Sequence, residues 1–510
     1  MRGYAARPVR RAVVLLALVL AAPAAAATIQ GTPHGDAIVG TQAADTISAG
    51  GGNDFVQAAF GGVDRVDCGR GLDVVSADLS DVVAANCEVV SRRLSVDLST
   101  NSSSQHETAV EPDDVAWGST VVATYQLGRF ASGASSNIGF ATSSNAGRTW
   151  QRGVLPGITV ESNPAGTQTA ASDPTVAYDA AHGVWLIGTL TLEPSSSHVL
   201  VARSTDGLSW ATPVVAATGP ELDKDWLTCD NGAASPHRGR CYLEYTDDQK
   251  NITVSQSSDD GGLTWSQPVA AASILVGAQP VVLPDGTLVV VAGDYADENG
   301  FHGSIVSLRS TDGGATFTRV TISDLNAKAN DVMRSIALPS AEADSTGKIY
   351  AVWHDCRFRP GCAENDVVLS TSTDGGQTWS TPSRVPSAAV SSTLDAFITG
   401  LAADPVQPGR LAVVYGYFHP GSCARGSCLL GTAVQQSSDG GVTWTPPQQL
   451  DAQPMQEDWL ARAEGGRMVG DYYSVEFAGN RVVPVFALAA PPLNGRFREA
   501  IFAASLPAIG

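Results

Sequence analysis

Several patterns that define common protein classes are missing from this sequence. After residue 22 no apolar run is long enough to cross a bilayer, which takes about 20 residues. No Cys-x-x-Cys pair occurs, no two histidines have the i, i+4 spacing of a helical zinc site, and neither a Gly-x-Ser-x-Gly nor a phosphate-binding Gly-Lys-Ser/Thr motif is present. The sequence therefore argues against a membrane-spanning protein, a His- or Cys-bound metal centre, a serine hydrolase and a nucleotide-binding enzyme.

Basic residues are also scarce. The chain has 31 Lys and Arg against 51 Asp and Glu, a formal charge of -20 at pH 7. Such an acidic surface repels polyanions unless basic groups gather locally, so nucleic acid is not expected as a partner. The same charge suits cations, and calcium is the cation that we expect.

The first residues have the composition of a secretory signal. Four arginines precede a short apolar run from Ala12 to Ala22, and small residues suited to a signal peptidase follow. An uncleaved membrane anchor is the alternative, but the run is shorter than a span and Pro23 follows it. We predict a signal peptide over residues 1–27 and a secreted, extracellular protein with no transmembrane anchor.

The eight cysteines lie in pairs that are close in sequence. An even count in an exported chain predicts disulfides. Sequential pairing is expected because each pair brackets a short polar or Gly-rich loop. The predicted bridges are Cys68–Cys87, Cys229–Cys241, Cys356–Cys362 and Cys423–Cys428.

A short repeat of aspartates follows the predicted signal. Asp36, Asp45 and Asp54 are nine residues apart, and after a one-residue slip Asp64 and Asp73 repeat the interval, each with an apolar residue two positions later. This pattern is typical of a parallel β-roll, in which glycines permit tight turns and the aspartates bind Ca²⁺. A flexible Gly/Asp-rich linker is the alternative, but a linker has no reason to keep the apolar position.

The aspartate segment resembles the RTX, or haemolysin-type, calcium-binding repeats over about residues 31–90. The resemblance implies Ca²⁺ as a cofactor, held between aspartates two turns apart. Thr32, Thr41 and Ala44 interrupt the glycine pattern of the first two turns, which weakens the first site. The pairs expected to flank calcium are Asp36 with Asp54, Asp45 with Asp64, and Asp54 with Asp73. We assign residues 28–92 to these repeats and residues 93–510 to a second domain.

A different motif, such as STDGGQTW at residues 372–379, occurs six times in that second domain. Its acidic or amide positions are Asn145, Asp206, Asp260, Asp312, Asp374 and Asp439, a period of 52–65 residues that is typical of a propeller or solenoid. Alternating strand-like runs precede each copy. In a turn, the Asp can accept backbone hydrogen bonds, Gly can adopt positive φ, and Trp or Phe can fill an apolar slot, so the motif predicts a structural role.

This motif resembles the Asp-box, or BNR repeat, of sialidases and related proteins, over about residues 107–505. The resemblance implies an all-β fold: an Asp-box β-propeller of seven blades, or alternatively six, with a small N-terminal parallel β-roll. Three predicted strands follow the last box. A fourth strand from residues 93–99 would close the ring and leave no open sheet edge.

Candidate site residues lie where the innermost strands are expected to begin. They are Glu111, Asp173, Asp223, Lys224, Asp225, Arg334, Asp395, Asp471 and Tyr472. By resemblance, a sialidase uses three arginines for the substrate carboxylate, a tyrosine nucleophile polarised by a glutamate, and an aspartate acid/base. We predict Tyr472, Asp225, Arg334 and Arg467 as catalytic residues, with rim or packing roles as the alternative. The family's Arg-Ile-Pro element is absent between Leu94 and Trp117, so one arginine has no counterpart.

Two functions fit these observations. The first is a sialidase-like protein that acts on extracellular glycans, by resemblance a retaining glycoside hydrolase of the exo-α-sialidase type. The second is a non-catalytic Asp-box protein that binds glycan or protein. Whether the chain is an enzyme stays open at this point. The expected partner is a glycan or a cell-surface glycoconjugate, and we expect a monomer.

Overall fold

The computed structural model describes residues 25–193, 195–297, 300–329, 332–419, 421 and 428–510. Most of the predicted signal peptide, residues 1–24, lies outside the described residues. The described elements are β-strands and two short 3-10 helices, η1 (Pro360–Cys362) and η2 (Glu457–Trp459). Over the part of the chain that is described, no helix is long and apolar enough to cross a membrane.

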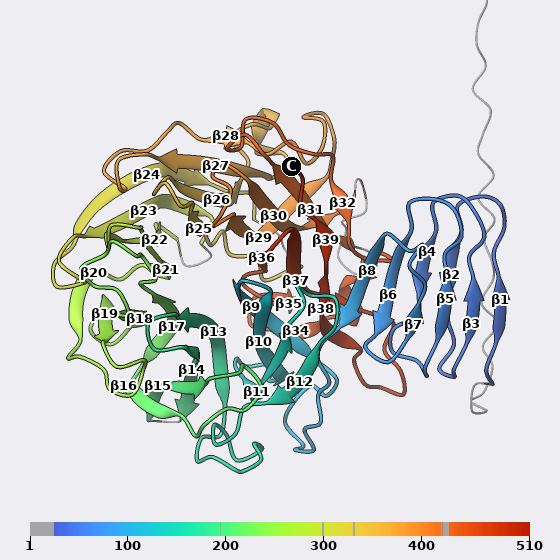
Figure 1. Ribbon diagram of the computed structural model, residues 1–510, viewed down its shortest axis with the longest axis horizontal. Helices are drawn as coiled ribbons and strands as arrows, with labels where there is room; N and C mark the ends of the chain where they lie inside the picture. Colours follow the sequence, from blue (N-terminus) through green and yellow to red (C-terminus); the bar gives the residue numbers. More distant parts are fainter. Residues whose placement is uncertain (1–24, 194, 298–299, 330–331, 420, 422–427) are drawn as a thin grey trace, which may run out of the picture.

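Residues 28–93 form a β-solenoid of stacked coils, drawn in blue in Figure 1. Its strands are β1 (Thr28–Gln30), β2 (Ala37–Val39), β3 (Thr46–Ser48), β4 (Phe55–Gln57), β5 (Arg65–Asp67), β6 (Val74–Asp78), β7 (Val82–Val83) and β8 (Val89–Arg93). Odd and even strands form two parallel sheets, in the orders β1-β3-β5-β7 and β2-β4-β6-β8. The apolar residue two positions after each repeat aspartate is buried between these sheets, as the repeat predicts.

The rest of the chain forms antiparallel sheets that follow one another around a circle in Figure 1; we call this part the sheet ring. Its first half contains β9 (Ala109–Trp117), β10 (Thr120–Arg129), β11 (Ser135–Ser143), β12 (Gln151–Val154), β13 (Ala171–Asp179), β14 (Val184–Glu193), β15 (Ser196–Ser204), β16 (Val214–Gly219), β17 (Leu222–Cys229), β18 (Cys241–Asp247), β19 (Ile252–Ser258) and β20 (Val269–Ser273). β9 to β16 form one eight-stranded sheet, and the strands β9, β13 and β17 face the centre of the ring (Figure 1).

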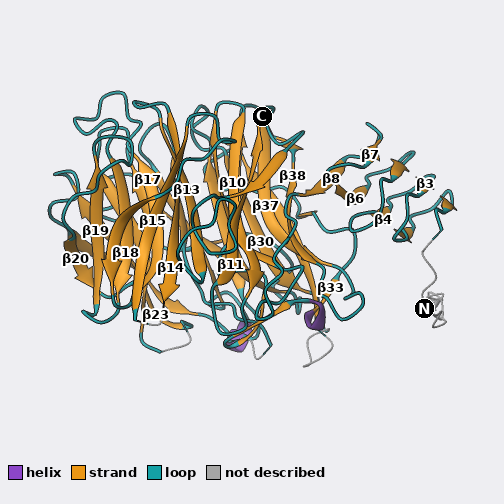
Figure 2. Cartoon of the chain, turned by 90° about the horizontal axis from the view of Figure 1, so that it is seen from below, coloured by secondary structure: helices purple, strands orange, loops and turns teal. Residues whose placement is uncertain are grey.

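The second half of the ring repeats this arrangement and ends beside the solenoid. Its strands are β21 (Val276–Val282), β22 (Leu288–Tyr295), β23 (His302–Ser310), β24 (Thr318–Asn326), β25 (Ser340–Ala343), β26 (Ile349–Asp355), β27 (Asp366–Ser372), β28 (Ser383–Arg384), β29 (Asp395–Ala403), β30 (Leu411–Phe418), β31 (Leu429–Ser437), β32 (Gln448–Gln449), β33 (Met455–Gln456), β34 (Ala461–Ala463), β35 (Gly466–Met468), β36 (Ser474–Ala478), β37 (Arg481–Ala489), β38 (Glu499–Ala504) and β39 (Leu506–Pro507). Figure 2 shows the ring edge-on, with the solenoid projecting from one side.

Side chains of the innermost strands tie these strands to one another. Asp113 on β9 accepts a hydrogen bond from the backbone N–H of Val176 on β13, at 2.8 Å. Ser474 on β36 accepts one from the N–H of Asp114 on β9, at 3.1 Å, and so joins the last sheet to the first. Such bonds satisfy buried backbone donors and fix where the innermost strands lie relative to one another.

The predicted fold class needs correction. The all-β class and the N-terminal parallel coils are confirmed, but the predicted β-propeller of seven or six blades is wrong. The stacked parallel coils are a β-solenoid, and its even-numbered sheet continues through β8 and β38 into β37 and β36 as one eight-stranded sheet. The partner of β38 is β8, which ends at Arg93, and not the predicted strand over residues 93–99. The repeats reveal local turns and strands but carry no information on which distant sheet edges pair.

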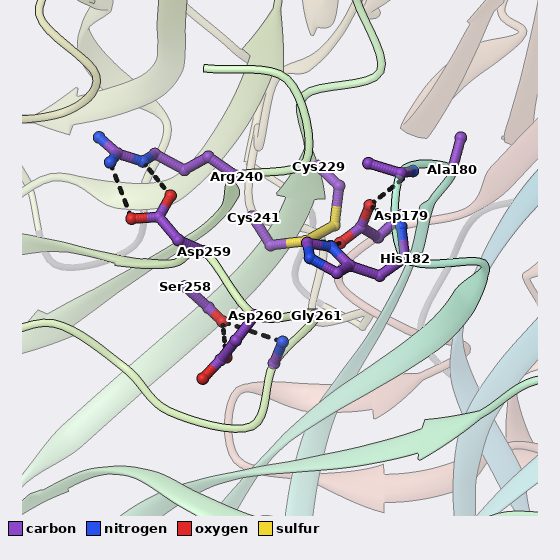
Figure 3. A network of polar contacts seen from close by, with 12 residues as sticks. Asp179, Ala180, His182, Cys229, Arg240, Cys241, Ser258, Asp259, Asp260 and Gly261 are labelled. Atoms are coloured by element: carbon purple, nitrogen blue, oxygen red, sulfur yellow. Dashed lines mark hydrogen bonds and ion pairs between the residues drawn. A yellow bond between two sulfur atoms is a disulfide. The ribbon is translucent and has the colours of Figure 1, made fainter.

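The predicted structural role of the repeated motif is confirmed. In the copy at residues 258–265, the Ser258 hydroxyl donates to Asp260 (Figure 3). The same hydroxyl accepts a hydrogen bond from the N–H of Gly262. Asp260 also accepts from the N–H of Thr264 at 2.9 Å, while Trp265 packs against an apolar cluster. The aspartate therefore closes a turn on the outside of its sheet.

We expect the copy at Asp374 to contribute to stability in an acid-sensitive way. Hydrogen bonds from the Thr378 side chain and N–H lower the pKa of Asp374 to about 2, so the stabilisation is complete above about pH 4 and is lost as pH falls toward 2. Asp374→Ala should cost about 1 kcal/mol at pH 7, as loss of a helix cap does, and less at pH 2.5. Urea unfolding at both pH values measures this. Thr373→Ala in the same turn is the control, and an equal loss in both variants would contradict the account.

Three predicted disulfides are present: Cys68–Cys87, Cys229–Cys241 and Cys356–Cys362. The first bridges two coils of the solenoid, and the second joins the paired ends of β17 and β18 (Figure 3). The fourth predicted bridge includes Cys423, which lies outside the described residues.

Candidate functional site

Three charged residues occupy the same irregular position on three neighbouring innermost strands. Glu111 on β9, Asp173 on β13 and Lys224 on β17 have φ of +54°, +43° and +52°. At each of them the pairing with the next strand shifts register, which is a β-bulge. Positive φ is strained for such residues, and bulges redirect side chains. The fold therefore maintains an unfavourable backbone that brings these three side chains together.

An ion network centred on Asp471 connects these positions. Lys224 Nζ lies 2.6 Å from Asp471 Oδ2 and 3.7 Å from Asp173 Oδ1. Arg334 binds the same carboxylate with two bonds, Nε to Oδ1 at 2.8 Å and Nη2 to Oδ2 at 2.7 Å. Glu111 accepts a hydrogen bond from Gln126. We call Glu111, Asp173, Lys224, Arg334 and Asp471 the charged cluster.

The protonation states within the charged cluster follow from burial and pairing. Burial alone would raise the pKa of Asp471, but Lys224 and Arg334 outweigh it and hold that pKa well below its usual range. Burial lowers the pKa of Lys224, but Asp173 and Asp471 outweigh this and the net shift is upward. Near neutral pH the carboxylate of Asp471 is therefore ionised, and Lys224 and Arg334 are charged.

The pKa values of Glu111 within the charged cluster, and of Asp223 and Asp225 beside it, are shifted the opposite way. Burial, helped by Asp173, raises the pKa of Glu111 to about 8 and that of Asp223 to about 7. Burial also raises the pKa of Asp225 well above its usual range, and neither of its carboxyl oxygens has a hydrogen-bond partner in the structure. Protons are therefore available at this site near neutral pH.

Tyr472 and Trp226 form an aromatic pair between the charged cluster and a cavity. Their ring centroids are 5.1 Å apart at 58°. Burial raises the pKa of Tyr472 well above 10, and Glu111 adds to the shift. Both rings line a cavity of about 730 Å³ along the inside of the sheet ring. An aromatic platform beside a cavity is a common way to bind the apolar face of a sugar.

The cavity wall next to Tyr472 contains a further acid. Asp113 lines the cavity, and burial raises its pKa to about 7. It accepts hydrogen bonds from the Val176 N–H and from the hydroxyls of Thr175 and Ser474. A carboxyl group with a pKa near 7 can donate a proton at physiological pH.

The structure gathers most of the residues predicted for this site. Tyr472 and Arg334 lie as described, and Asp225 is close enough to Tyr472 to affect its pKa. Arg467 on β35 points elsewhere: its Nη1 donates to the Leu460 carbonyl at 2.8 Å. Asp395 lies apart from the charged cluster and pairs with Lys328 at 3.2 Å.

Sequence reasoning missed Asp113 and the aromatic role of Trp226. Asp113 stands two residues after Glu111, and Trp226 two residues after Lys224. Both follow a β-bulge, which interrupts the alternation of faces, so strand spacing from Glu111 and Lys224 could not have located them. The bulges themselves have no signal in the sequence, because no glycine marks Glu111, Asp173 or Lys224.

A second candidate site is the row of aspartates on the solenoid. The backbone N–H of Asp36 donates to the carboxylate of Asp54 at 2.8 Å, that of Asp45 to Asp64 at 2.7 Å, and that of Asp54 to Asp73 at 2.8 Å. These are the three pairs that the RTX resemblance led us to expect. The coil thus brings aspartates 18–19 residues apart into contact.

The aspartate row fits calcium at its later positions better than at its first two. Asp54, Asp64 and Asp73 are buried, and each has one carboxylate oxygen without a hydrogen-bond partner. Asp36 and Asp45 instead bind Thr32 and Thr41 through N–H and hydroxyl groups. No three His, Cys, Asp or Glu side chains converge as a metal-binding group within the described chain, so backbone carbonyls would have to complete an ion's shell.

A family model and a curated relative both match part of this chain. A family described as a BNR repeat-like domain matches residues 191–474. A sialidase from Micromonospora viridifaciens is 30% identical over 203 residues, which is 38% of this chain and 30% of that sialidase. The chain therefore matches less than a third of that relative's length.

The solved structures found in the comparison are much more distant. The Hadza microbial sialidase Hz136 is 18% identical with a TM-score of 0.43, and the match covers 61% of this chain and 65% of that protein. The phage phi92 endosialidase is 11% identical with a TM-score of 0.47, over 86% of this chain and 73% of that one. An α-L-arabinofuranosidase from Fusarium graminearum is 16% identical with a TM-score of 0.44, over 67% and 96%.

Proposed function

This chain belongs to the BNR repeat-like family, and on that premise we propose that it is a sialidase-like glycoside hydrolase that binds a sugar in the cavity beside Tyr472 and Trp226. The observation that carries the proposal is the placement of this aromatic pair between a cavity and several protonatable carboxyl groups. The sugar's apolar face would stack on Trp226. Disulfides support an extracellular setting, where glycans are the expected partners.

The proposed reaction uses groups on two sides of the aromatic pair. Asp113 would give a proton to the leaving glycosidic oxygen as the bond to the anomeric carbon breaks. Tyr472 Oη would attack that carbon and pass its own proton to Glu111. Water would then attack the anomeric carbon and give its proton to Asp113, while Glu111 returns its proton to Tyr472 Oη as the bond to the sugar breaks. These roles follow the tyrosine and glutamate pair that the Asp-box resemblance implies.

Aryl glycoside reporters test the proposal. Purified protein is incubated with reporters of neutral, amino and acidic sugars in both anomeric forms, and release of the aryl group is measured. Turnover of at least one reporter supports the proposal. Absence of turnover on every reporter would refute hydrolysis.

A non-catalytic glycan-binding protein is the second candidate function. The observation that favours it is the pair of hydrogen bonds from Arg334 to Asp471, because a guanidinium bound in this way is not free to bind a substrate carboxylate. Binding on a glycan array without hydrolysis of the bound glycans would select this candidate over the first.

We also propose that the solenoid binds calcium through Asp54, Asp64 and Asp73, whose unpaired buried oxygens support it. Calcium removal should then loosen residues 28–93 and leave the sheet ring folded, because no comparable row of aspartates occurs in the described part of the ring. We expect limited proteolysis of this segment to become about 10-fold faster with chelator.

Variants separate calcium binding from a general effect of the chelator. Asp64→Asn should be cleaved rapidly even with calcium present. Asp67→Asn, an exposed position three residues away on β5, should behave like the unmodified protein. Equal cleavage with and without calcium would rule the ion out.

A further inference from the structure

We propose that this site selects sugars without a carboxylate, either neutral or amino-substituted, and rejects sialic and uronic acids. The inference rests on the proposed glycan site and narrows its substrate class. This substrate class differs from the one that the sialidase resemblance implies. The argument for it therefore uses only the charges and contacts of this chain.

The first argument is the composition of the cavity wall. Among the described residues that line it, none is Lys, Arg or His. Six carboxylic acids line it instead: Asp113, Asp114, Glu342, Asp344, Asp404 and Glu476. Burial raises the pKa of four of these acids, Asp113, Asp114, Glu342 and Glu476, so the wall is less negative near neutral pH than their number suggests. A ligand carboxylate would still meet no cation there, and Asp344, whose pKa is held low by hydrogen bonds, would repel it and attract an ammonium group.

The second argument is that the cations of the charged cluster are already occupied. Arg334 uses Nε and Nη2 on Asp471, the two groups that would otherwise form a fork for a substrate carboxylate. Lys224 lies 2.6 Å from the same carboxylate and also faces Asp173. A substrate anion would have to displace Asp471, whose side chain is fully buried and would lose its partners.

The third argument concerns the uncharged groups on the cavity wall. Tyr178, Trp226 and Tyr472 line it, together with the hydroxyl side chains of Thr228 and Ser340. These groups offer aromatic faces and hydrogen bonds to sugar rings and hydroxyls, which suits an uncharged ligand. The site as a whole therefore offers hydrogen bonds and aromatic surface, but no unpaired positive charge within the described residues.

Matched pairs of sugars test the inference. Glucose and glucuronic acid differ only at C6, as do galactose and galacturonic acid, so aryl glycosides and oligosaccharides of each pair isolate the carboxylate. We expect kcat/KM, or affinity in a direct binding assay if no reporter is hydrolysed, to be at least about 30-fold higher for the neutral member of each pair. Glucosaminides should equal or exceed the neutral sugars. Equal values, or a preference for uronic acids or sialosides, would overturn the inference.

The source of the discrimination is tested by Asp471→Asn, which should free Arg334 and Lys224 and shift the ratio toward the acidic sugar about 10-fold or more. Asp259→Asn is the control, because Asp259 forms the same two-bond pair with Arg240 on the outer surface. The matched pairs on unmodified protein decide the question even if Asp471→Asn does not fold. If no sugar of any charge is bound or hydrolysed, the proposed glycan site itself fails, and the inference fails with it.

Discussion

Tyr472→Phe is expected to lower kcat by about 1,000-fold while changing KM little. The substitution removes only the hydroxyl that is proposed to attack the anomeric carbon. The ring keeps its position against Trp226, at 5.1 Å between centroids, so the sugar platform is preserved. Initial rates on the best reporter, with binding measured separately, distinguish the two effects.

Tyr178→Phe is the matched control for this experiment. Tyr178 also lines the cavity, but its ring packs on Trp117 and Trp185 and not on Trp226. Its kcat should stay within about 3-fold of the unmodified protein. If Tyr472→Phe behaves like Tyr178→Phe, Tyr472 is not the nucleophile.

The pH profile gives an independent check on these roles. Asp113, with a pKa of about 7, must be protonated to act, so activity declines as pH rises above about 7. Glu111, with a pKa of about 8, must be ionised to accept the tyrosine proton, so activity declines as pH falls below about 8. The expected profile is a bell with its maximum between pH 7 and 8. Asp113→Asn should remove the alkaline limb.

Lys224→Met is expected to destabilise the protein by about 3 kcal/mol. The substitution preserves side-chain length but removes a charge whose side chain is only 8% exposed. Asp173 and Glu111 would then lie close to Asp471 with less compensating charge, which is the costly case of a buried ion pair broken on one side. The midpoint of urea unfolding at constant slope measures the loss.

Lys250→Met provides the comparison for this prediction. Lys250 pairs with Asp247 at 2.5 Å, but its side chain is 65% exposed, so water can replace the interaction. Its loss should change stability by less than about 0.5 kcal/mol. Similar small losses for both variants would mean that the charged cluster is solvated and not a buried network.

Part of this architecture could be predicted because local repeats determine it. The spacing of Asp45 and Asp64 fixes one coil of the solenoid, and the turn at Asp260 needs only its neighbours in sequence. The continuous sheet through β8 and β38 could not be predicted. It pairs Arg93 with Phe502, and nothing in either segment indicates that partner.

The residues of the candidate site could be predicted from the sequence, but the ion pairs and hydrogen bonds between them could not. The sequence places three of these residues where innermost strands are predicted to begin, and we chose them as candidates for that reason: Lys224, Arg334 and Asp471. Lys224 meets Asp471 from a β-bulge with positive φ, a strained conformation that no glycine marks in the sequence. This is why the occupied state of Arg334, which opposes sialidase chemistry, emerges only from the structure.

The most direct test of the account is a crystal structure of the protein with a neutral sugar bound, taken from the best substrate or ligand of the reporter and array experiments. The account predicts the sugar inside the cavity, with its apolar face within about 4.5 Å of the Trp226 ring and its anomeric carbon facing Tyr472. A sugar bound elsewhere on the molecule, with this cavity empty at saturating concentration, would contradict it.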